Sequence, residues 1–209
     1  MDAWSRGDNQ AKLIDDVSFL RDDSVVIYAG GYTGVTVEKH QKSSAFYAHI
    51  FEPVAQYFVQ LSDKFDVAAS KIVVHHSGLS NRNGSALIQL STDGSKVVAA
   101  AAAGQDVETV RLETLDRVFY GSVRVRHSGM VDFLYVNCEG CEYDLLPDII
   151  NTRIIASVRR LHVQFHLQDG SAESVNRRCL IREALRKTHE PVFAFPFVWE
   201  GWVLKSHPV

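Results

Sequence analysis

Residues 24–34 read SVVIYAGGYTG, an apolar run that leads into three glycines. A short, continuous run of β-branched and aromatic residues predicts a strand that is buried on both faces of a sheet. Gly30, Gly31 and Gly34 then predict a tight turn into a short helix that begins near Val35. A parallel strand that ends in this way is the usual place for a nucleotide-like ligand, because glycines allow close backbone approach and the helix start presents free N–H groups.

The rest of the chain repeats this alternation of short apolar runs with amphipathic stretches. We predict strands over residues 46–51, 71–76, 131–136 and 157–165, and helices over residues 9–21, 54–65, 143–150 and 172–189. Residues 191–197 and 199–205 predict two strands joined by a tight bend. We therefore expect an α/β fold, with helices on both faces of a mostly parallel sheet whose last strand is antiparallel.

The middle of the chain is less regular. Strands are predicted over residues 86–91 and 107–112, a turn over 92–95, and a short helix over 115–120. The five alanines at 99–103 suit a helix or a closely packed strand, and both alternatives stay open. No linker or repeat divides the chain, so we expect one domain over 1–209, made of an N-terminal helical segment (1–23) and a core (24–209).

Composition and charge narrow the class of protein. Hydrophobic residues make up 46% of the chain and the net charge is -3, as in a globular protein with a sizeable core. This charge gives no general attraction to nucleic acid or anionic membrane, so neither partner is expected. There is no apolar run of ~20 residues that would predict a membrane-spanning helix, and no signal peptide is visible. The three cysteines, an odd number, suggest a reducing compartment. We expect a cytoplasmic location.

An acidic residue follows the second predicted strand. Glu52 stands at its end, where a carboxylate can accept hydrogen bonds from both hydroxyls of a ribose. The phosphate-binding pattern of dinucleotide folds is absent, so a pyrophosphate is not indicated. The alternative is that the glycines form only a tight turn and Glu52 is a surface residue.

A second acidic turn, VNCEGCE at residues 136–142, ends the strand over 131–136. The carboxyl ends of parallel strands line one crevice, so Asn137, Glu139 and Glu142 should lie beside the glycine turn. Glu142 could instead lie in the first turn of the next helix, where its negative charge would interact favourably with the helix dipole. Cys138 and Cys141 form a C-x-x-C pair, but zinc needs two more ligands and no second pair exists, so we expect structural cysteines.

Four segments together resemble the FkbM family of S-adenosylmethionine (SAM)-dependent O-methyltransferases, and the resemblance runs from about residue 24 to the C-terminus. They are VIYAGGYTG at 26–34, FEP at 51–53, LETLD at 112–116 and VDFLYVNCEGCE at 131–142. The resemblance implies the Rossmann-like class I methyltransferase fold, with a seven-stranded sheet. This chain departs from the family at Tyr28, where Asp is usual, and at Tyr135 and Asn137, where Lys and Asp are usual.

The same resemblance implies a set of SAM-binding residues. Gly30, Gly31, Tyr32 and Gly34 would line the SAM pocket, and Glu52 would hold the ribose. Ser77 and Gly78 would approach the adenine, while Asn137 and Glu139 would face the methionine part and the reacting methyl group.

The predicted catalytic residues are His166, Glu139 and Asn137. His166 follows the strand over 157–165, and an ordinary pKa near 6.5 would leave it neutral at pH 7 and able to act as the base. The alternative is that His166 caps the strand end. His75 and His76 are weaker candidates of the same kind.

Three further residues are candidates for binding the substrate. Glu142, Trp199 and Trp202 are predicted to bind substrate, the tryptophans as an aromatic platform, although core packing is the more frequent fate of such residues. Glu139, Glu142, Asp132 and His166 could hold a divalent cation, but no spacing enforces such a site and no metal is predicted.

We therefore expect a SAM-dependent O-methyltransferase that acts on a hydroxyl of a sugar or glycan. A nicotinamide-dependent oxidoreductase and a degenerate SAM-binding domain are the alternatives. The sequence does not predict the oligomeric state.

Overall fold

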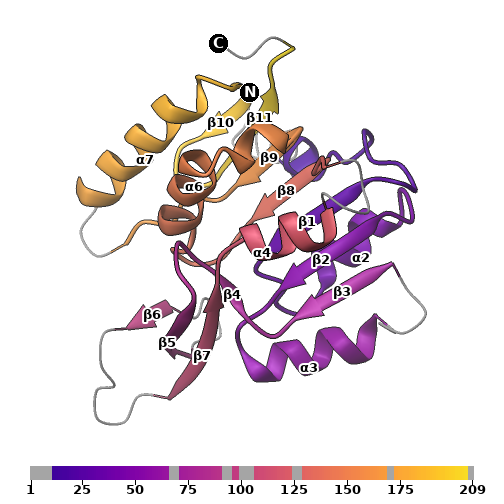
Figure 1. Ribbon diagram of the computed structural model, residues 1–209, viewed down its shortest axis with the longest axis vertical. Coiled ribbons are helices and arrows are strands. Elements are labelled where there is room, and N and C mark those ends of the chain that lie inside the picture. Colours follow the sequence, from indigo (N-terminus) through magenta and orange to yellow (C-terminus); the bar gives the residue numbers. More distant parts are fainter. Residues whose placement is uncertain are drawn as a thin grey trace, which may run out of the picture.

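The computed structural model describes residues 11–65, 71–90, 96–98, 106–123, 129–168 and 172–206, with the backbone only for 96–98. Its larger sheet has seven strands (Figure 1). These are β1 (Val25–Ala29), β2 (Tyr47–Phe51), β3 (Ile72–His75), β8 (Phe133–Val136), β9 (Arg160–Val163), β10 (His189–Phe195) and β11 (Trp199–Leu204). The helices are α2 (Val35–Gln41), α3 (Ala55–Lys64), α4 (Asp116–Val118), α6 (Glu142–Asn151) and α7 (Ala172–Leu185), with a π-helical turn at Phe119–Val123 and a 3-10 turn at Ile154–Ser157.

The strand order of the larger sheet is β10-β11-β9-β8-β1-β2-β3. The pairs from β3 to β9 are parallel, whereas β11 is antiparallel to both β9 and β10. The predicted parallel sheet with an antiparallel last strand is thus confirmed. The predicted strands and the helices over 54–65 and 143–150 agree with the structure within a few residues at their ends.

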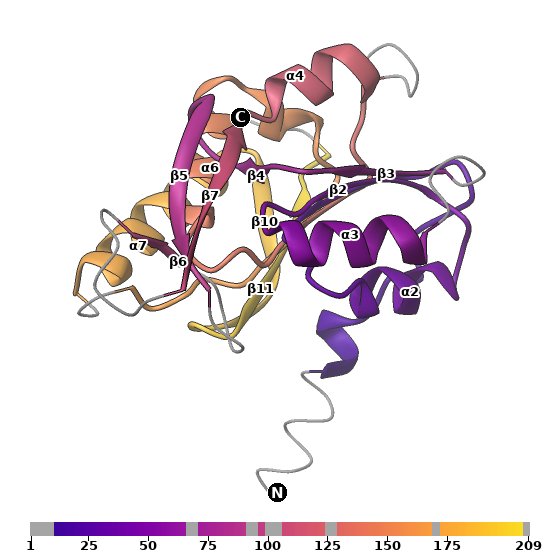
Figure 2. The ribbon, with the colours of Figure 1, turned by 90° about the horizontal axis from the view of Figure 1, so that it is seen from below.

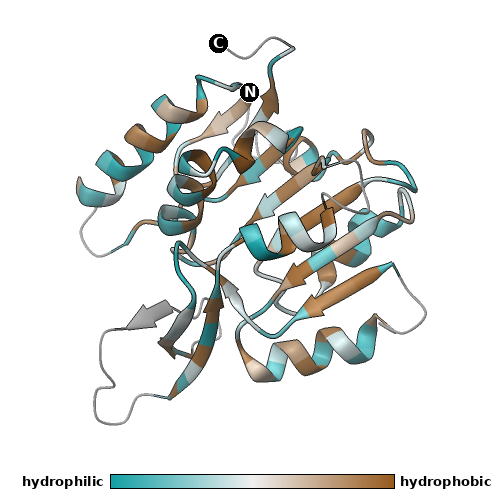
Figure 3. Ribbon diagram, viewed as in Figure 1, coloured by the Kyte–Doolittle hydropathy of each residue, from teal (hydrophilic) through white to brown (hydrophobic). Residues whose placement is uncertain are grey.

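Alternate residues of β1 face opposite sides of the sheet, as a strand requires. Val25, Ile27 and Ala29 pack with residues of α4, α6 and α7, whereas Val26 and Tyr28 pack with residues of α2, α3 and the N-terminal segment. Figure 2 shows α4 and α6 on one side of the sheet and α2 and α3 on the other. In Figure 3 α7 carries both hydrophobic and hydrophilic residues. Ile181 and Leu185 of this helix are buried against the sheet, whereas Leu180 is exposed.

A second, four-stranded sheet was not predicted. Its strands are β4 (Gly78–Leu79), β5 (Gly84–Gln89), β6 (Lys96–Val98) and β7 (Val107–Glu113), in the order β4-β7-β5-β6. The predicted strands over 86–91 and 107–112 belong to this sheet. It has its own small core around Ile88, Val110 and Leu112. The alanines at 99–103 and the turn at 92–95 lie outside the described residues.

Two predicted helices are shorter in the structure. Of the helix over 9–21, residues 11–14 are helical in the described part, and the chain then turns while Val17 and Leu20 stay buried against the sheet. Helix α7 ends at Leu185, because His189 is already in β10 and its Nε2 donates to the carbonyl oxygen of Val158 (2.8 Å). Among the described residues, no helix is long and apolar enough to cross a bilayer.

The tyrosines that depart from the family pattern lie in the core beneath α2. The side chain of Tyr28 is 1% exposed and its hydroxyl is 2.9 Å from Nδ1 of His40. Tyr135 packs on Tyr28 and on Trp199, with ring centroids 5.7 and 4.7 Å apart. Both tyrosines therefore act as packing residues with a polar partner inside the core.

A matched pair of leucines tests this division between core and surface. Leu146 of α6 is fully buried, whereas Leu180 of α7 is 66% exposed. Leu146→Ala should lower the free energy of unfolding by about 2–5 kcal/mol, because it removes buried methyl groups and leaves a cavity. Leu180→Ala should change it by less than about 0.5 kcal/mol. Urea denaturation measures both, and equal losses would contradict the packing described.

Candidate functional site at the carboxyl edge of the sheet

The glycine turn, Glu52 and Asn137 meet where strand order reverses. Strand β1 lies between β2 and β8. The amide of Gly30 donates to the carbonyl oxygen of Phe51 (3.0 Å), and the amide of Asn137 donates to that of Ala29 (2.9 Å). The ends of three neighbouring strands are thus held side by side. In open α/β sheets this switch point is where ligands bind.

Gly30 has to be glycine at this place. Its φ is +92°, and a Cβ atom there would overlap the carbonyl oxygen of Asn137. Gly34, with φ +77°, precedes α2 and packs on Leu61 and Phe65. The turn therefore brings bare backbone to the sheet edge and directs the chain into α2.

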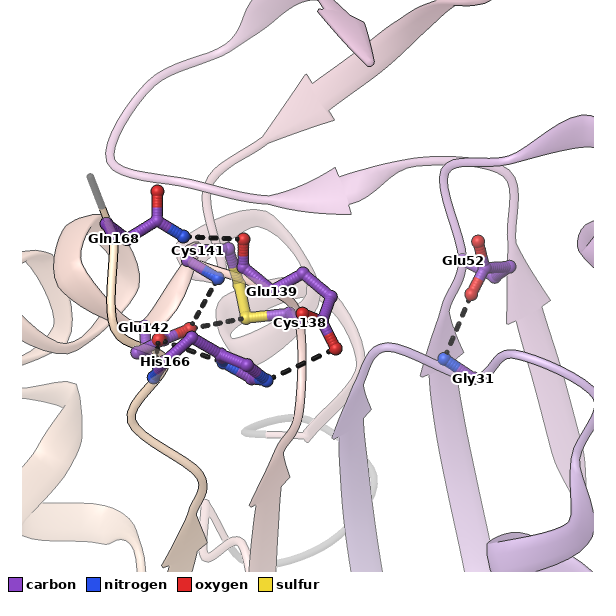
Figure 4. Close-up of a disulfide and its surroundings, with 9 residues drawn as sticks. Gly31, Glu52, Cys138, Glu139, Cys141, Glu142, His166 and Gln168 are labelled. Carbon is purple, nitrogen blue, oxygen red and sulfur yellow. Dashed lines mark hydrogen bonds and ion pairs between the residues drawn. A yellow bond between two sulfur atoms is a disulfide. The ribbon is translucent and has the colours of Figure 1, made fainter. Parts of the chain in front are cut away.

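Glu52 holds the glycine turn in shape. One carboxylate oxygen accepts from the amide of Gly31 (3.2 Å), as Figure 4 shows, and from the amide of Tyr32 (2.8 Å). The other oxygen accepts from the amide of Val54 (2.9 Å). Burial raises the pKa of Glu52, and the three backbone hydrogen bonds oppose that rise. A carboxylate has about four acceptor positions, so one remains for a ligand such as a ribose hydroxyl. The surface alternative is excluded, since Glu52 is 5% exposed.

The side chain of Tyr32 is exposed at this edge of the sheet. Its φ of +47° is unusual for a large side chain, and the hydrogen bond from its amide to Glu52 supports that conformation. The ring is 52% exposed and meets Tyr57 of α3 edge to face, with centroids 4.5 Å apart. The predicted cofactor residue Tyr32 therefore stands beside the glycine turn with an accessible ring.

Asn137 contributes a buried acceptor. Within the described part of the chain its Oδ1 is buried and has no hydrogen-bond partner. Buried polar atoms are nearly always paired, and leaving one unpaired costs about 1–3 kcal/mol. Asn137 Oδ1 is therefore suited to accept a hydrogen bond from an N–H or O–H group of a ligand at the switch point.

The acidic turn after β8 is closed by a disulfide between Cys138 and Cys141. The sequence analysis expected structural cysteines without predicting this bond, and the disulfide means that the cysteine content no longer supports a reducing compartment. Inside the ring, Glu139 (φ +54°) and Gly140 (φ +117°) are both left-handed. The predicted strand-to-helix turn is thus a tight loop that projects the Glu139 side chain.

Glu142, the first residue of α6, is an internal anchor. Its carboxylate accepts from the amides of Gly140 (2.9 Å) and His166 (2.8 Å) and lies 3.1 Å from Nδ1 of His166. It is fully buried. Direct contact of Glu142 with a substrate, as predicted, does not fit this burial; it fixes the groups around it.

His166 lies between two carboxylates, as Figure 4 shows. Its Nδ1 faces Glu142, and its Nε2 is 3.2 Å from Oε1 of Glu139. Burial alone would lower its pKa, but the hydrogen bonds and charges of Glu139 and Glu142 outweigh burial and raise the pKa to about 9. His166 is therefore protonated at pH 7. The prediction of a neutral histidine that acts as general base is wrong in this structure, because both flanking carboxylates favour the cation.

Ser77 and Gly78 lie beyond β3, next to Pro53. The Ser77 hydroxyl donates to Glu113, and Gly78 packs near Pro53 and Leu112. Both residues are thus on the Glu52 side of the edge, and an adenine contact at them stays a prediction. Glu113 is buried here and was not predicted as a site residue, although it falls in the LETLD segment.

The predicted aromatic platform is not supported. Trp202 is fully buried, with the guanidinium of Arg182 over its ring, and Trp199 is 8% exposed against Tyr135. Both rings serve the core, so neither presents a free face to a substrate.

The other candidates do not join the site. Asp132 lies at the start of β8 and accepts from the amide of Val25. His75 stacks on Phe51, and His76 stacks on Phe58. Within the described ranges, no three His, Cys, Asp or Glu side chains are grouped as a metal site.

Gln168 is a site residue that the sequence analysis missed. Its Nε2 donates to the carbonyl oxygen of Glu139 (3.0 Å), and its amide fills the space beside Gly140. Its only sequence signal was its place two residues after His166, in a loop at the same sheet edge.

Comparison with known proteins supports the fold. No protein-family model and no curated protein matches the chain. Solved structures do match. An rRNA methylase from Streptococcus thermophilus has a TM-score of 0.53 at 12% identity, over 94% of each chain. A Streptococcus mutans protein described as a methyltransferase and solved with SAH has a TM-score of 0.53 at 9% identity, over 94% of this chain and 97% of that one. The METTL16 MTase domain has a TM-score of 0.53 at 10% identity, over 99% of this chain and 70% of that one. The chain thus has the Rossmann-like class I methyltransferase fold.

The expected partner is corrected by these comparisons. A sugar or glycan acceptor with no nucleic acid was expected, but the Streptococcus thermophilus structure is named an rRNA methylase. A Clostridium thermocellum protein described as an rRNA methylase also matches, with a TM-score of 0.54 at 7% identity. The exclusion of nucleic acid relied on net charge, and a whole-chain charge does not describe a local binding surface. The sugar acceptor relied on analogy with the FkbM family.

The protonation state of His166 can be measured directly. Its ring should titrate by NMR with a pKa of about 9, and Glu139→Gln should lower that value by removing a charge 3.2 Å away. Glu190→Gln, on exposed strand β10, is the control and should leave it unchanged. Because the folded pKa exceeds the unfolded value of about 6.5, the stabilisation is complete below pH 6.5 and is lost as pH rises through 9. A pKa near 6.5 in the unmodified protein would contradict the ion-pair geometry.

Proposed function

We propose that this chain is a SAM-dependent methyltransferase of the FkbM type, which transfers the methyl group to a hydroxyl oxygen. The observation that carries the proposal is the meeting of the Gly30 turn, Glu52 and the unpaired Oδ1 of Asn137 at the switch point of a class I methyltransferase sheet. The methyltransferase names of the matching structures favour SAM over a nicotinamide dinucleotide.

The residues at this edge fit SAM in their chemistry. Gly30, Gly31 and Tyr32 give backbone access, and the remaining acceptor position of Glu52 would take a ribose hydroxyl. Asn137 Oδ1 would accept from the amino group of the methionine part. Ser77 and Gly78, on the Glu52 side, would approach the adenine. When bound, SAM supplies a methyl group that is already activated on a sulfonium.

Glu139 is the side chain that we assign to the acceptor. Its carboxylate is 36% exposed and held by protonated His166, so it can accept a hydrogen bond from the acceptor hydroxyl. That hydroxyl becomes more acidic as its oxygen gains a bond to carbon, and Glu139 would then take the proton. His166 would stay protonated and keep Glu139 oriented. The protein's main contributions are therefore alignment and proton acceptance.

We propose RNA as the acceptor class. Two matching structures carry the name rRNA methylase, and RNA offers hydroxyl groups along its whole length. The exposed ring of Tyr32 beside the glycine turn supports this choice, since proteins hold unpaired RNA bases by stacking them on aromatic side chains.

Cofactor binding is tested with two glycine variants. Gly30→Ala should weaken SAM binding at least about tenfold, because the new Cβ overlaps the Asn137 carbonyl and displaces the turn; tenfold corresponds to about 1.4 kcal/mol. Gly121→Ala is the control, since nothing lies within 4 Å of its Cβ position. Isothermal titration calorimetry with SAM and NAD, after thermal melting has shown both variants folded, measures the effect. Binding of NAD alone would refute the proposed function.

Methyl transfer is tested with labelled SAM and total RNA. Glu139→Gln should lower the transfer rate by about 10²–10⁴-fold, the usual contribution of a positioned base, while the Kd for SAM changes little. Glu190→Gln again serves as the control. Unchanged transfer by the Glu139 variant would remove its assignment, and transfer to a non-RNA extract fraction only would overturn the acceptor class.

A further inference from the structure

The Cys138–Cys141 disulfide encloses the residue that points at His166. The ring formed by the disulfide contains only Glu139 and Gly140 between the cysteines, and both have left-handed backbone. A left-handed conformation is unfavourable for a residue such as Glu and persists only where the surroundings enforce it. The covalent ring is the strongest constraint on Glu139.

The other constraints on this turn are non-covalent: two act on the backbone and one on the Glu139 side chain. Gln168 holds the carbonyl of Glu139, and Glu142 holds the amide of Gly140. The side chain of Glu139 meets His166 through one contact of 3.2 Å, and it is 36% exposed. A change in the backbone of the ring would therefore release this side chain, while the buried pair of Glu142 and His166 would remain.

The ring also touches the glycine turn. A Cβ at Gly30 would lie 3.5 Å from Cα of Cys138, and Sγ of Cys138 is 3.6 Å from Oε2 of Glu142. Both cysteines are only half-buried. The disulfide is thus at the junction of the glycine turn, the acidic turn and His166, between two cysteines that are only partly buried.

We propose that the Cys138–Cys141 disulfide is a redox-controlled positioning element, which holds the Glu139 carboxylate against His166 and releases it when a dithiol protein or small dithiol reduces the bond. Its effect on methyl transfer rests on the proposed function. Its effect on the geometry of Glu139 and His166 does not, so the two can fail separately.

The exchange balances without any further reactant. A thiolate of the dithiol attacks one sulfur, the S–S bond breaks, and its electron pair leaves on the other cysteine. Cys141 is the better leaving group, since it stands at the N-terminus of α6, where the helix dipole favours a thiolate. The second thiol of the reductant then displaces the protein sulfur, so that the dithiol is oxidised to its disulfide and two protein cysteines are reduced.

The test compares oxidised and reduced forms of the whole chain. Reduction with dithiothreitol should lower the pKa of His166 by about one unit, a tenfold change in proton affinity, because Glu139 is released while Glu142 stays. The SAM-dependent rate should fall about tenfold in kcat with little change in KM for the acceptor. Reoxidation should restore both values. Mass spectrometry after alkylation reports the state of the cysteines in each sample.

Two variants separate this effect from general reduction or unfolding. The double variant Cys138→Ser/Cys141→Ser should behave as the reduced protein under all conditions, whereas Cys179→Ser, which removes the free exposed cysteine, should respond to reductant like the parent. If the double variant does not fold, the reduced parent gives the same information. An identical His166 titration in the two redox states of the parent would overturn the proposal. A shifted titration without any methyl transfer would support the positioning role and refute the proposed function.

Discussion

The buried carboxylate of Glu142 is the interaction on which the site depends. It accepts hydrogen bonds from two segments that are far apart in sequence, the turn after β8 and the loop after β9, and its charge is matched by protonated His166. A fully buried carboxylate without a cation would be strongly unfavourable, and removal of one partner of such a pair typically costs about 3–5 kcal/mol. The position of His166, which Glu139 contacts, therefore follows from the need to neutralise Glu142.

The three charged groups Glu142, His166 and Glu139 have two different roles. Glu142 and the imidazolium of His166 form a stable internal pair, whereas Glu139 is in contact with both His166 and solvent. Two carboxylates and one cation leave a net negative charge, and it resides on the most accessible group. A carboxylate that is oriented yet accessible suits an acceptor hydroxyl, which needs both direction and a place for its proton.

The larger sheet was predictable from the sequence because its central strands are buried on both faces and so appear as continuous apolar runs, as in residues 25–29 and 133–136. The second sheet was not, since its strands are short or half-exposed and β4 has only two residues. The spacing of apolar residues over 9–21 predicted too long a helix, for a related reason. Val17 and Leu20 are apolar because they cover the sheet, and they do so without a helix.

For the site, the sequence predicted that the glycine turn, Asn137 and His166 lie at one edge, because the carboxyl ends of parallel strands share it. It missed Gln168 and wrongly added the tryptophans, whose burial depends on the packing of the whole sheet. It could not predict the chemical states of the site residues. The charge of His166 depends on contacts with residues 24 and 27 positions away, and the pairing of Cys138 with Cys141 depends on the two left-handed residues between them. The unpaired Oδ1 of Asn137 is likewise visible only in three dimensions.

The departures from the family pattern gain a physical meaning in this context. Tyr28 and Tyr135 face the core side of the sheet, where the Tyr28 hydroxyl pairs with His40, so they do not alter the polar edge. Asn137 differs, because it stands at the switch point itself. An amide there offers an acceptor without adding a third negative charge to Glu139 and Glu142. An aspartate there would add a negative charge beside Glu139 and Glu142, and among the described residues His166 is the cation that contacts both of them. A neutral acceptor therefore suits the charge balance around His166.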